Sequence, residues 1–264
     1  MIAIDLLIVR AERLAAAGER EGAAWALYRA ASGAADGTRA AAWLEQALAW
    51  VDGLTCDRLR GSIAALAAEL AYEAGDVMGA VAASRDAEAR FQRAGDARGF
   101  LAVWTARALR ALRVGDPEAG LTMTRWILPW LDQVAEPAPR MWLRLYAGEA
   151  ELAADDVEAA VGFALDVLEL AAAGSDERLL ATELLVRALV GLDRRDDGVR
   201  AALVELERLG GDDGLRSRLY RTVALILADS DPGLARACHA AAEALGHAPA
   251  PTPTPRAVVS PLLA

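Results

Sequence analysis

The chain has 264 residues, of which 55% are hydrophobic but only 5% aromatic, and its formal net charge is −10. All 28 of its basic side chains are arginine, which excludes a P-loop lysine and a lysine Schiff base with pyridoxal phosphate. The acidic balance disfavours nonspecific binding to nucleic acid, whose phosphate backbone is negative. Much of the apolar content is alanine, the strongest helix former, and this predicts an all-α fold.

Two features of the sequence predict a cytoplasmic protein. The cysteines, Cys56 and Cys238, are too few for a disulfide framework, and we interpret both as reduced thiols. The N-terminal stretch MIAIDLLIVRAERLAAAGER carries Asp5 and Arg10 within its apolar part, which is typical of an amphipathic helix and not of a secretory signal. No uncharged apolar run approaches the ~18 residues of a membrane span, so we expect no membrane partner.

Hydrophobic periodicity predicts a leading helix at residues 3–17, followed by six antiparallel helix pairs. The predicted pairs are 22–35 with 38–52, 57–74 with 76–93, 98–114 with 116–134, 139–153 with 156–172, 176–192 with 195–209, and 213–228 with 231–246. Residues 1–246 are therefore expected to form one helical-repeat domain. The proline-rich tail 247–264 is expected to be disordered, either as a frayed terminus or as a tether ending in the apolar motif VVSPLL.

The predicted corners between helices recur at a nearly constant interval. In the corner LRVGDPEAG, Gly115 suits the left-handed end of a helix, Asp116 can cap the next helix, and Pro117 suits its first position. An interval of about 40 residues is in the range of helical solenoids. The small residue expected five positions after each helix stop gives the series Ala40, Ala80, Gly120, Ala159, Gly198 and, less well, Leu234.

Small residues also mark the predicted contact between helices 57–74 and 76–93. Ala68, Ala80 and Ala87 fall where these two helices would cross. Small side chains at a crossing let the helix axes approach toward the low end of the ~8–10 Å range. These alanines are therefore predicted to be buried.

The corners resemble those of the tetratricopeptide repeat family. The unit 101–134 places Trp104, Ala108, Gly115 and Gly120 at the family's tryptophan, small, glycine and small positions. The resemblance covers about residues 3–246 and implies a right-handed superhelical solenoid of antiparallel helix pairs. The unit 4–34 also matches, which leaves the N-terminal register with two alternatives; its matching residues are Leu7, Ala11, Leu14, Gly18, Ala23 and Leu27.

Two departures from the family pattern refine this resemblance. The period is longer than the usual 34 or so residues, and the proline that usually follows the second helix is mostly missing. The long form looks like the repeats in the sensor halves of large bacterial transcription activators. HEAT-type repeats, which have a similar period, are the structural alternative.

The sequence contains no motif for covalent or metal chemistry. It has no Gly-x-Ser-x-Gly elbow, and the neighbours Cys238 and His239 point about 100° apart around a helix, so they make no metal site by themselves. We therefore expect no catalytic residue, no metal site and no cofactor. Acidic pairs occur at predicted helix starts, where capping accounts for them: Asp155-Asp156, Asp196-Asp197 and Asp212-Asp213.

Two sets of residues are candidates for binding a partner. Trp126 and Trp130 lie four positions apart on one predicted helix face, either as packing within or between repeats or as an aromatic anchor for a partner. In tetratricopeptide arrays the first helix of each unit lines a concave groove. Carried over position by position, the resemblance implies a groove of mixed charge formed by Thr105, Arg113, Arg144, Glu151, Glu183 and Arg187.

These observations favour a non-catalytic scaffold or adaptor that binds another protein or a peptide in its concave groove. The alternative is a regulatory module of a bacterial transcription or signalling system that senses a ligand or peptide. An enzyme is disfavoured because the motifs of catalysis are missing. A DNA-binding protein is disfavoured because the chain lacks a basic stripe with interleaved aromatic residues.

Overall fold

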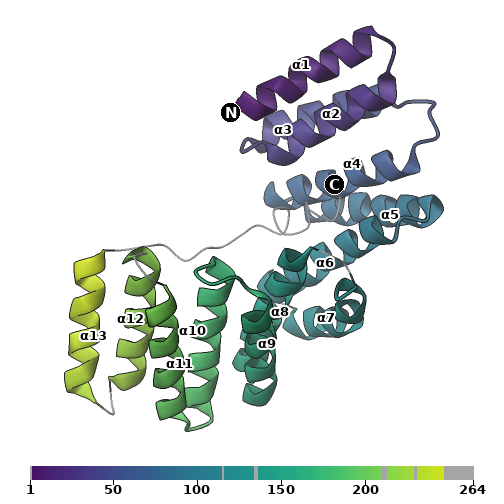
Figure 1. The fold of residues 1–264 in the computed structure, drawn as a ribbon. Helices are drawn as coiled ribbons and strands as arrows, with labels where there is room; N and C mark the ends of the chain where they lie inside the picture. Colours follow the sequence, from purple (N-terminus) through teal and green to yellow (C-terminus); the bar gives the residue numbers. More distant parts are fainter. Residues whose placement is uncertain (1, 115, 134–135, 210–212, 229–230, 247–264) are drawn as a thin grey trace. The chain divides into compact units, whose positions relative to one another are not determined.

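The computed structural model describes residues 2–114, 116–133, 136–209, 213–228 and 231–246 (Figure 1). Within these residues the chain forms thirteen α-helices and no strand, and each helix end lies within three residues of its predicted position. The predicted all-α fold is therefore confirmed, whereas Gly115, Asp212 and the tail 247–264 lie outside the described residues. The helices are α1 (Ile2–Ala16), α2 (Arg20–Gly33), α3 (Gly37–Trp50), α4 (Asp57–Glu73), α5 (Val77–Ala94), α6 (Ala97–Val114), α7 (Pro117–Leu131), α8 (Pro137–Ala153), α9 (Val157–Leu170), α10 (Asp176–Gly191), α11 (Arg195–Arg208), α12 (Asp213–Leu227) and α13 (Pro232–Leu245).

Aspartate caps recur along the chain with a period of 40 residues. The carboxylates of Asp36, Asp76, Asp116 and Asp156 each accept hydrogen bonds from backbone N–H groups in the first turn of α3, α5, α7 and α9. These bonds satisfy donors that have no partner within the helix, which is why aspartate is preferred at this position. The repeat seen in the sequence is therefore a repeat of helix starts.

One predicted corner is wrong by a single position. The buried small residue after the Asp156 cap is Ala160, not Ala159. The residue before this cap, Asp155, takes the left-handed conformation (φ 66°) that Gly75 takes (φ 83°) at an earlier corner. Aspartate visits this region more readily than most residues that carry a Cβ. A sequence pattern that expects a small residue at the end of the helix counts from Ala154, whereas the left-handed residue is Asp155. The predicted position is therefore one residue too early.

The last predicted corner is displaced in the same direction. Asp231 caps α13 by accepting a hydrogen bond from the Leu234 N–H (3.0 Å), and the buried small residue is Ala235. Leu234, which was predicted at that place, is exposed. The acidic pair Asp196 and Asp197 lies in the first turn of α11, where negative charge is favoured by the helix dipole.

The chain divides into two compact units within α6, after Arg107. In the first unit α1 packs on α2, α2 on α3, and α4 on α5. In the second unit α8 packs on α9, α10 on α11, and α12 on α13. Even-numbered helices also contact one another across repeats, α2 with α4 in the first unit and α8 with α10 and α10 with α12 in the second. Each unit is thus a stack of helix pairs in which even-numbered helices form a row.

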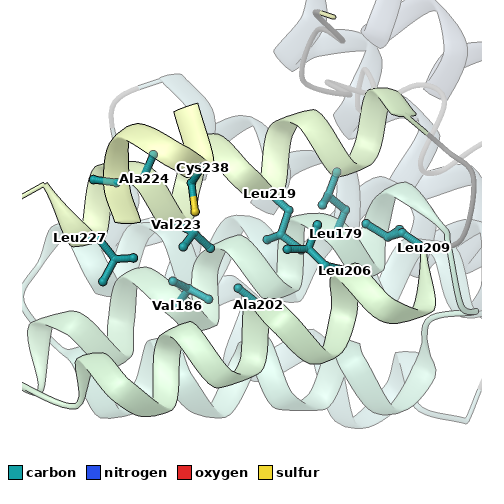
Figure 2. Packing of buried hydrophobic residues seen from close by; sticks show 11 residues of the cluster. Leu179, Val186, Ala202, Leu206, Leu209, Leu219, Val223, Ala224, Leu227 and Cys238 are labelled. Carbon is teal, nitrogen blue, oxygen red and sulfur yellow. The ribbon is translucent and has the colours of Figure 1, made fainter. Parts of the chain in front are cut away.

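The core of the C-terminal helices is aliphatic (Figure 2). Small residues such as Ala202 and Ala224 lie beside leucines and valines, which lets the helices of neighbouring pairs approach closely. The thiol of Cys238 belongs to this cluster, and burial raises its pKa. The cluster comprises Leu179, Val186, Ala202, Leu206, Leu209, Leu219, Val223, Ala224, Leu227, Ala235 and Cys238.

Phe91 of α5 is the largest fully buried side chain of the first unit, and two glycines make room for its ring. A Cβ placed on Gly61 of α4 would lie 2.9 Å from a Phe91 ring carbon, and one on Gly99 of α6 would lie closer still. Real Cβ atoms essentially never make contacts this short, so both positions require glycine while the ring keeps its place. The predicted alanines of this region, including Ala80, are buried.

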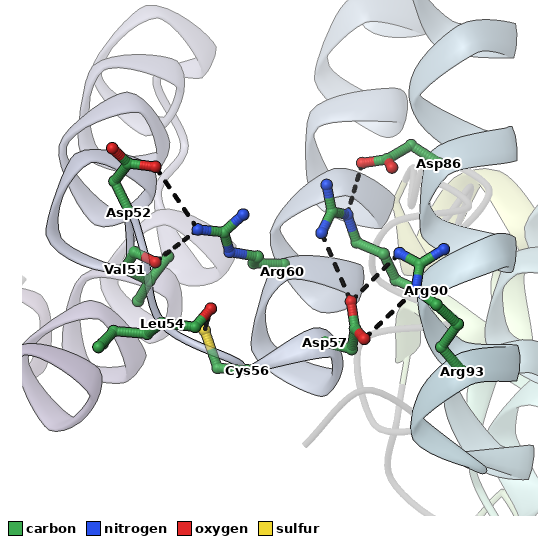
Figure 3. Close-up of polar contacts among 9 residues, drawn as sticks. All are labelled: Val51, Asp52, Leu54, Cys56, Asp57, Arg60, Asp86, Arg90 and Arg93. Carbon is green, nitrogen blue, oxygen red and sulfur yellow. Dashed lines mark hydrogen bonds and ion pairs between the residues drawn. The ribbon is translucent and has the colours of Figure 1, made fainter.

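Ion pairs tie the start of α4 to the end of α5 (Figure 3). The Arg93 guanidinium donates hydrogen bonds to both carboxylate oxygens of Asp57, at 3.2 and 3.3 Å. Arg90 lies 3.6 Å from the same carboxylate and also donates to Asp86 (2.8 Å). The hydrogen bond from Arg93 lowers the pKa of Asp57.

Candidate functional site

The first unit contains an open groove of about 710 Å³ between α3 and α4. Its walls are mainly alanine and leucine, and Leu44 and Leu70 form part of its buried floor. The two helices stay close at one end, where a Cβ on Gly37 would lie 3.7 Å from the Leu70 side chain. The lining residues are Gly37, Thr38, Ala41, Leu44, Glu45, Leu48, Ala67, Leu70, Ala71, Glu73, Ala74 and Asp76.

Helix α4 carries smaller side chains along the groove than α10 carries at the corresponding positions. The two helices can be aligned on the left-handed residues that follow them, Gly75 and Asp193. In this register, three groove-lining alanines, two in α4 and one directly after it, correspond to three leucines, two in α10 and one directly after it. Each alanine lacks three carbon atoms of a leucine side chain. The corresponding pairs are Ala67 with Leu185, Ala71 with Leu189, and Ala74 with Leu192.

The three leucines of α10 fill the equivalent space in the second unit. Leu185 and Leu189 are buried in a cluster with residues of α9, and Leu192 packs against the same cluster. Helix α10 therefore packs on α9 through leucines at these positions, while α4 presents only alanine methyl groups there and contacts α3 through Leu70. The side chains at these three positions are therefore smaller beside the groove than in the contact between α9 and α10.

The rim of the groove is acidic. Glu45 of α3 and Glu73 at the end of α4 line it, together with Asp76, the cap of α5. One carboxylate oxygen of Asp76 accepts a hydrogen bond from the Gly79 N–H (2.9 Å). None of the described residues that line the groove is an arginine, although the chain has many. An apolar floor with carboxylates at its edge complements a ligand that is apolar on one side and basic beside it.

Exposed apolar side chains occur in the groove lining and at the start of α5. Leu48 of α3 is 43% exposed, and Val77, the residue after Asp76, is also exposed. Met78 is 78% exposed and Val81 is exposed one turn further on. Exposed apolar residues are common at binding surfaces, and methionine in particular adapts to different partners.

Three of the predicted groove residues do not face solvent, and this corrects the sequence-based set. Thr105 is fully buried, and its Oγ1 has no hydrogen-bond partner within the described part of the chain. Arg144 and Glu151 of α8 are 7% and 3% exposed. Arg144 and Glu151 are buried because three helices, α7, α9 and α10, pack against α8 and leave little of its surface free.

The two buried charges of α8 hold neighbouring helices. Arg144 donates to Asp166 of α9 (3.1 Å) and, from Nη2, to both oxygens of Asp132 at the end of α7 (2.9 and 3.0 Å). Glu151 accepts a hydrogen bond from Arg125 of α7 (2.7 Å). These side chains are therefore part of the internal structure of the second unit.

The other predicted groove residues lie at the contacts along the row of even-numbered helices. Arg187 of α10 donates to Glu149 of α8 (2.7 Å), and both side chains are about half exposed. Glu183 of α10 accepts from Arg218 of α12 (2.6 Å). The mixed charge predicted for this surface is thus largely paired within the chain.

Arg113 of α6 lies over the ring of Tyr146, 5.6 Å from its centroid. Burial raises the pKa of Tyr146, and the neighbouring Arg113 guanidinium opposes that rise. Arg113 is exposed and is therefore part of the surface of the second unit.

Trp126 and Trp130 are 48% and 53% exposed on α7. Helix α7 continues to Leu131, two residues past Pro129, and keeps both tryptophans on it. Trp142, by contrast, is buried, and its Nε1 donates to Glu177 of α10 (3.1 Å). Core packing therefore accounts for Trp142 but not for the pair on α7.

The groove between α3 and α4 was not predicted from the sequence. The signal that could have found it is the alanine triplet of α4 set against the leucine triplet of α10 in the aligned repeats. Nowhere in the described residues, the groove included, do three His, Cys, Asp or Glu side chains gather as a metal site would require. No helix in the described ranges is both long and apolar enough to cross a membrane.

Comparisons with known proteins add the following. No family model matches the chain, and no curated protein matches it. NprR, in a crystal structure with its cognate peptide NprX, is 16% identical with a TM-score of 0.47, and the match covers 79% of this chain and 59% of NprR. A tetratricopeptide repeat protein from Parabacteroides merdae ATCC 43184 is 14% identical with a TM-score of 0.47, and the match covers 100% of this chain and 98% of that one. The chain's own stacked helix pairs define an all-α helical-repeat protein, as the tetratricopeptide resemblance implied.

Proposed function

We propose that this protein is a non-catalytic scaffold that binds a segment of another protein in the groove between α3 and α4. The observation that carries the proposal is a groove of about 710 Å³ with an apolar floor, in a repeat whose counterpart in the second unit is filled by leucine. Burial of apolar surface is the main favourable term in association, so an open apolar groove is where a partner gains most.

The groove is a better candidate than the surface of the even-numbered helices in the second unit. There, the charged side chains already pair with one another, as Arg187 does with Glu149 and Arg218 with Glu183. A partner that bound these groups would first have to break their ion pairs. In the groove, the alanine methyl groups lose nothing when a partner covers them.

The test is a variant in which the groove is filled by the chain itself, Ala67→Leu/Ala71→Leu/Ala74→Leu. It copies the three leucines that α10 carries at the aligned positions. Affinity capture from lysate of the source cells, with quantitative mass spectrometry, compares the wild-type chain with this variant. We expect at least one protein to be retained by the wild type and lost by the variant.

The matched control is Leu225→Ala in α12, which removes a highly exposed apolar side chain far along the sequence from the groove. It should retain the same proteins as the wild type. Circular dichroism of all three chains checks that their helix content is equal. Identical protein sets on the wild-type and filled chains would contradict the proposal.

A further inference from the structure

We infer that the occupant of the groove is a basic amphipathic helix: three large aliphatic residues on one face, at positions i, i+4 and i+7, with lysine or arginine beside them. This inference rests on the proposed function and specifies the partner's chemistry. It is carried by the size of the missing side chains, by the nature of the groove walls and by the charge of the rim.

The missing side chains set the apolar face of the occupant. Ala67, Ala71 and Ala74 are spaced i, i+4 and i+7 along α4, so the unfilled space runs along the helix for about 10 Å. In the second unit the equivalent space is filled by three leucines from the chain itself. An occupant has to supply aliphatic groups of about that size and number. A helix presents such groups at the same spacing as α4 leaves the gaps.

The walls decide between a helix and an extended peptide. Both walls are helices, whose backbone N–H and C=O groups are used in their own hydrogen bonds except near the ends. Polar groups in the lining are limited to Thr38 and the three acidic residues. An extended peptide would bury unpaired backbone groups against alanine and leucine, at a cost of roughly 1–3 kcal/mol for each group. In a helical occupant the backbone N–H and C=O groups are already hydrogen-bonded to one another, so this cost is avoided.

The rim sets the charge of the occupant. Glu45, Glu73 and Asp76 line the groove, and no described lining residue is basic. A helix with acidic flanks would meet like charge here, while one with basic flanks would meet opposite charge. Val77 and Met78, which follow Asp76 in sequence, are exposed and apolar.

The test uses defined peptides and fluorescence anisotropy. The probe is a capped, fluorescein-labelled helical peptide with leucine at i, i+4 and i+7 and lysine flanking that face. One control has the same composition with the leucines moved off a common face, and a second has every lysine replaced by glutamate. We expect saturable binding of the probe and at least about tenfold weaker binding of each control.

Variants of the protein locate the binding. The filled variant Ala67→Leu/Ala71→Leu/Ala74→Leu should bind the probe at least about tenfold more weakly. The variant Glu45→Arg/Glu73→Arg should lose affinity for the lysine peptide and gain it for the glutamate peptide. Because the second result is a gain of binding, it cannot arise from misfolding, and the single variant Glu45→Arg provides the same test with less perturbation.

Each remaining outcome separates this inference from the proposed function. Equal binding of the lysine and glutamate peptides, or preference for the peptide without a common leucine face, overturns the inference and leaves the groove as a binding site. If the filled variant loses a captured protein but the wild-type chain binds none of the peptides, the inference is likewise overturned and the groove remains a binding site. Equal probe binding by wild-type and filled chains overturns both.

Two other occupants are tested with the same variants. Light scattering that shows a wild-type dimer and a monomeric filled variant would assign the groove to a second copy of the chain. Probe binding that appears only after deletion of residues 254–264 would assign it to the chain's own C-terminal segment. Either result overturns the basic helix as the natural occupant.

Discussion

At the scale of single residues, glycine and aspartate determine how closely the helices pack and where they begin. Phe91 occupies space that exists because Gly61 and Gly99 have no side chain. Asp57 is held by two arginines at the opposite end of the neighbouring helix. Both arrangements lead to measurable effects of single substitutions.

Replacement of Gly61 by alanine should destabilise the protein. The new methyl group would lie 2.9 Å from the Phe91 ring, which is buried and has no room to retreat. We expect a loss of about 1–3 kcal/mol in the free energy of unfolding, measured by urea titration. The control is Gly162→Ala in α9, where nothing lies within 4 Å of the added Cβ; it should gain roughly 0.5–1 kcal/mol from helix propensity. Equal effects at the two sites would contradict the packing argument.

The stability of the protein should fall in acid partly through Asp57. The hydrogen bond from Arg93 holds the pKa of Asp57 below its ordinary value in the folded state. A carboxylate with a lowered folded pKa contributes stability above its unfolded pKa of about 4, and this contribution is lost as pH falls through the folded value. Urea midpoints measured between pH 6 and pH 2.5 should show this loss. In the variant Asp57→Asn, the urea midpoint should fall less between pH 6 and pH 2.5 than it does in the wild type, because the titrating carboxylate is missing.

At the scale of elements, buried ion pairs join helices that are adjacent in the stack. Arg178, near the start of α10, donates to both carboxylate oxygens of Glu205 on α11 (3.0 and 2.9 Å). The same guanidinium donates to the Leu168 and Ala171 carbonyls at the end of α9. One side chain therefore satisfies the end of one helix and positions a second.

Removal of the Glu205 carboxylate should be costly. The Glu205 side chain is only 3% exposed, so Glu205→Ala leaves the Arg178 charge in a largely buried site. We expect a loss of about 3–5 kcal/mol in the free energy of unfolding. The control is Glu149→Ala, whose pair with Arg187 is about half exposed and should contribute ~0–1 kcal/mol. Chemical denaturation of both variants, side by side, checks the contrast.

Much of the element order could be predicted from the sequence, because aspartate caps and small residues mark each corner. The groove residues were predicted less well. Arg144 and Glu151 were placed on an open surface because the resemblance assigns a face to the first helix of each unit. The packing of α8 by α7, α9 and α10 instead buries them. The α3–α4 groove depends on side-chain volume across two helices, which periodicity does not report.

At the scale of the whole molecule, two contacts between successive helix pairs differ in how they are filled. The contact of α10 with α9 uses leucines where α4 has alanines facing α3. Stability in a repeat array is approximately a sum of local terms, so each junction can be changed separately. The open junction therefore gives up local stability that the filled one keeps.

Filling the open junction should raise the melting temperature. Ala67→Leu/Ala71→Leu/Ala74→Leu buries three aliphatic side chains, and we expect a gain of about 0.5–2 kcal/mol, the usual range for filling a cavity. The reciprocal change, Leu189→Ala in α10, should cost about 2–5 kcal/mol because it opens a filled core. Thermal melts followed by circular dichroism measure both. A lower melting temperature for the filled variant would show that the groove is shaped by something other than the alanine triplet.

The even spacing of the aspartate caps has a consequence for how such a chain can change in length. Asp36, Asp76, Asp116 and Asp156 stand 40 residues apart, and the side chain of each caps the helix that follows it. Excision or duplication of a 40-residue block between two caps joins one aspartate-capped corner to another. Recombination within the gene can therefore add or remove whole 40-residue repeats while each remaining helix keeps its aspartate cap.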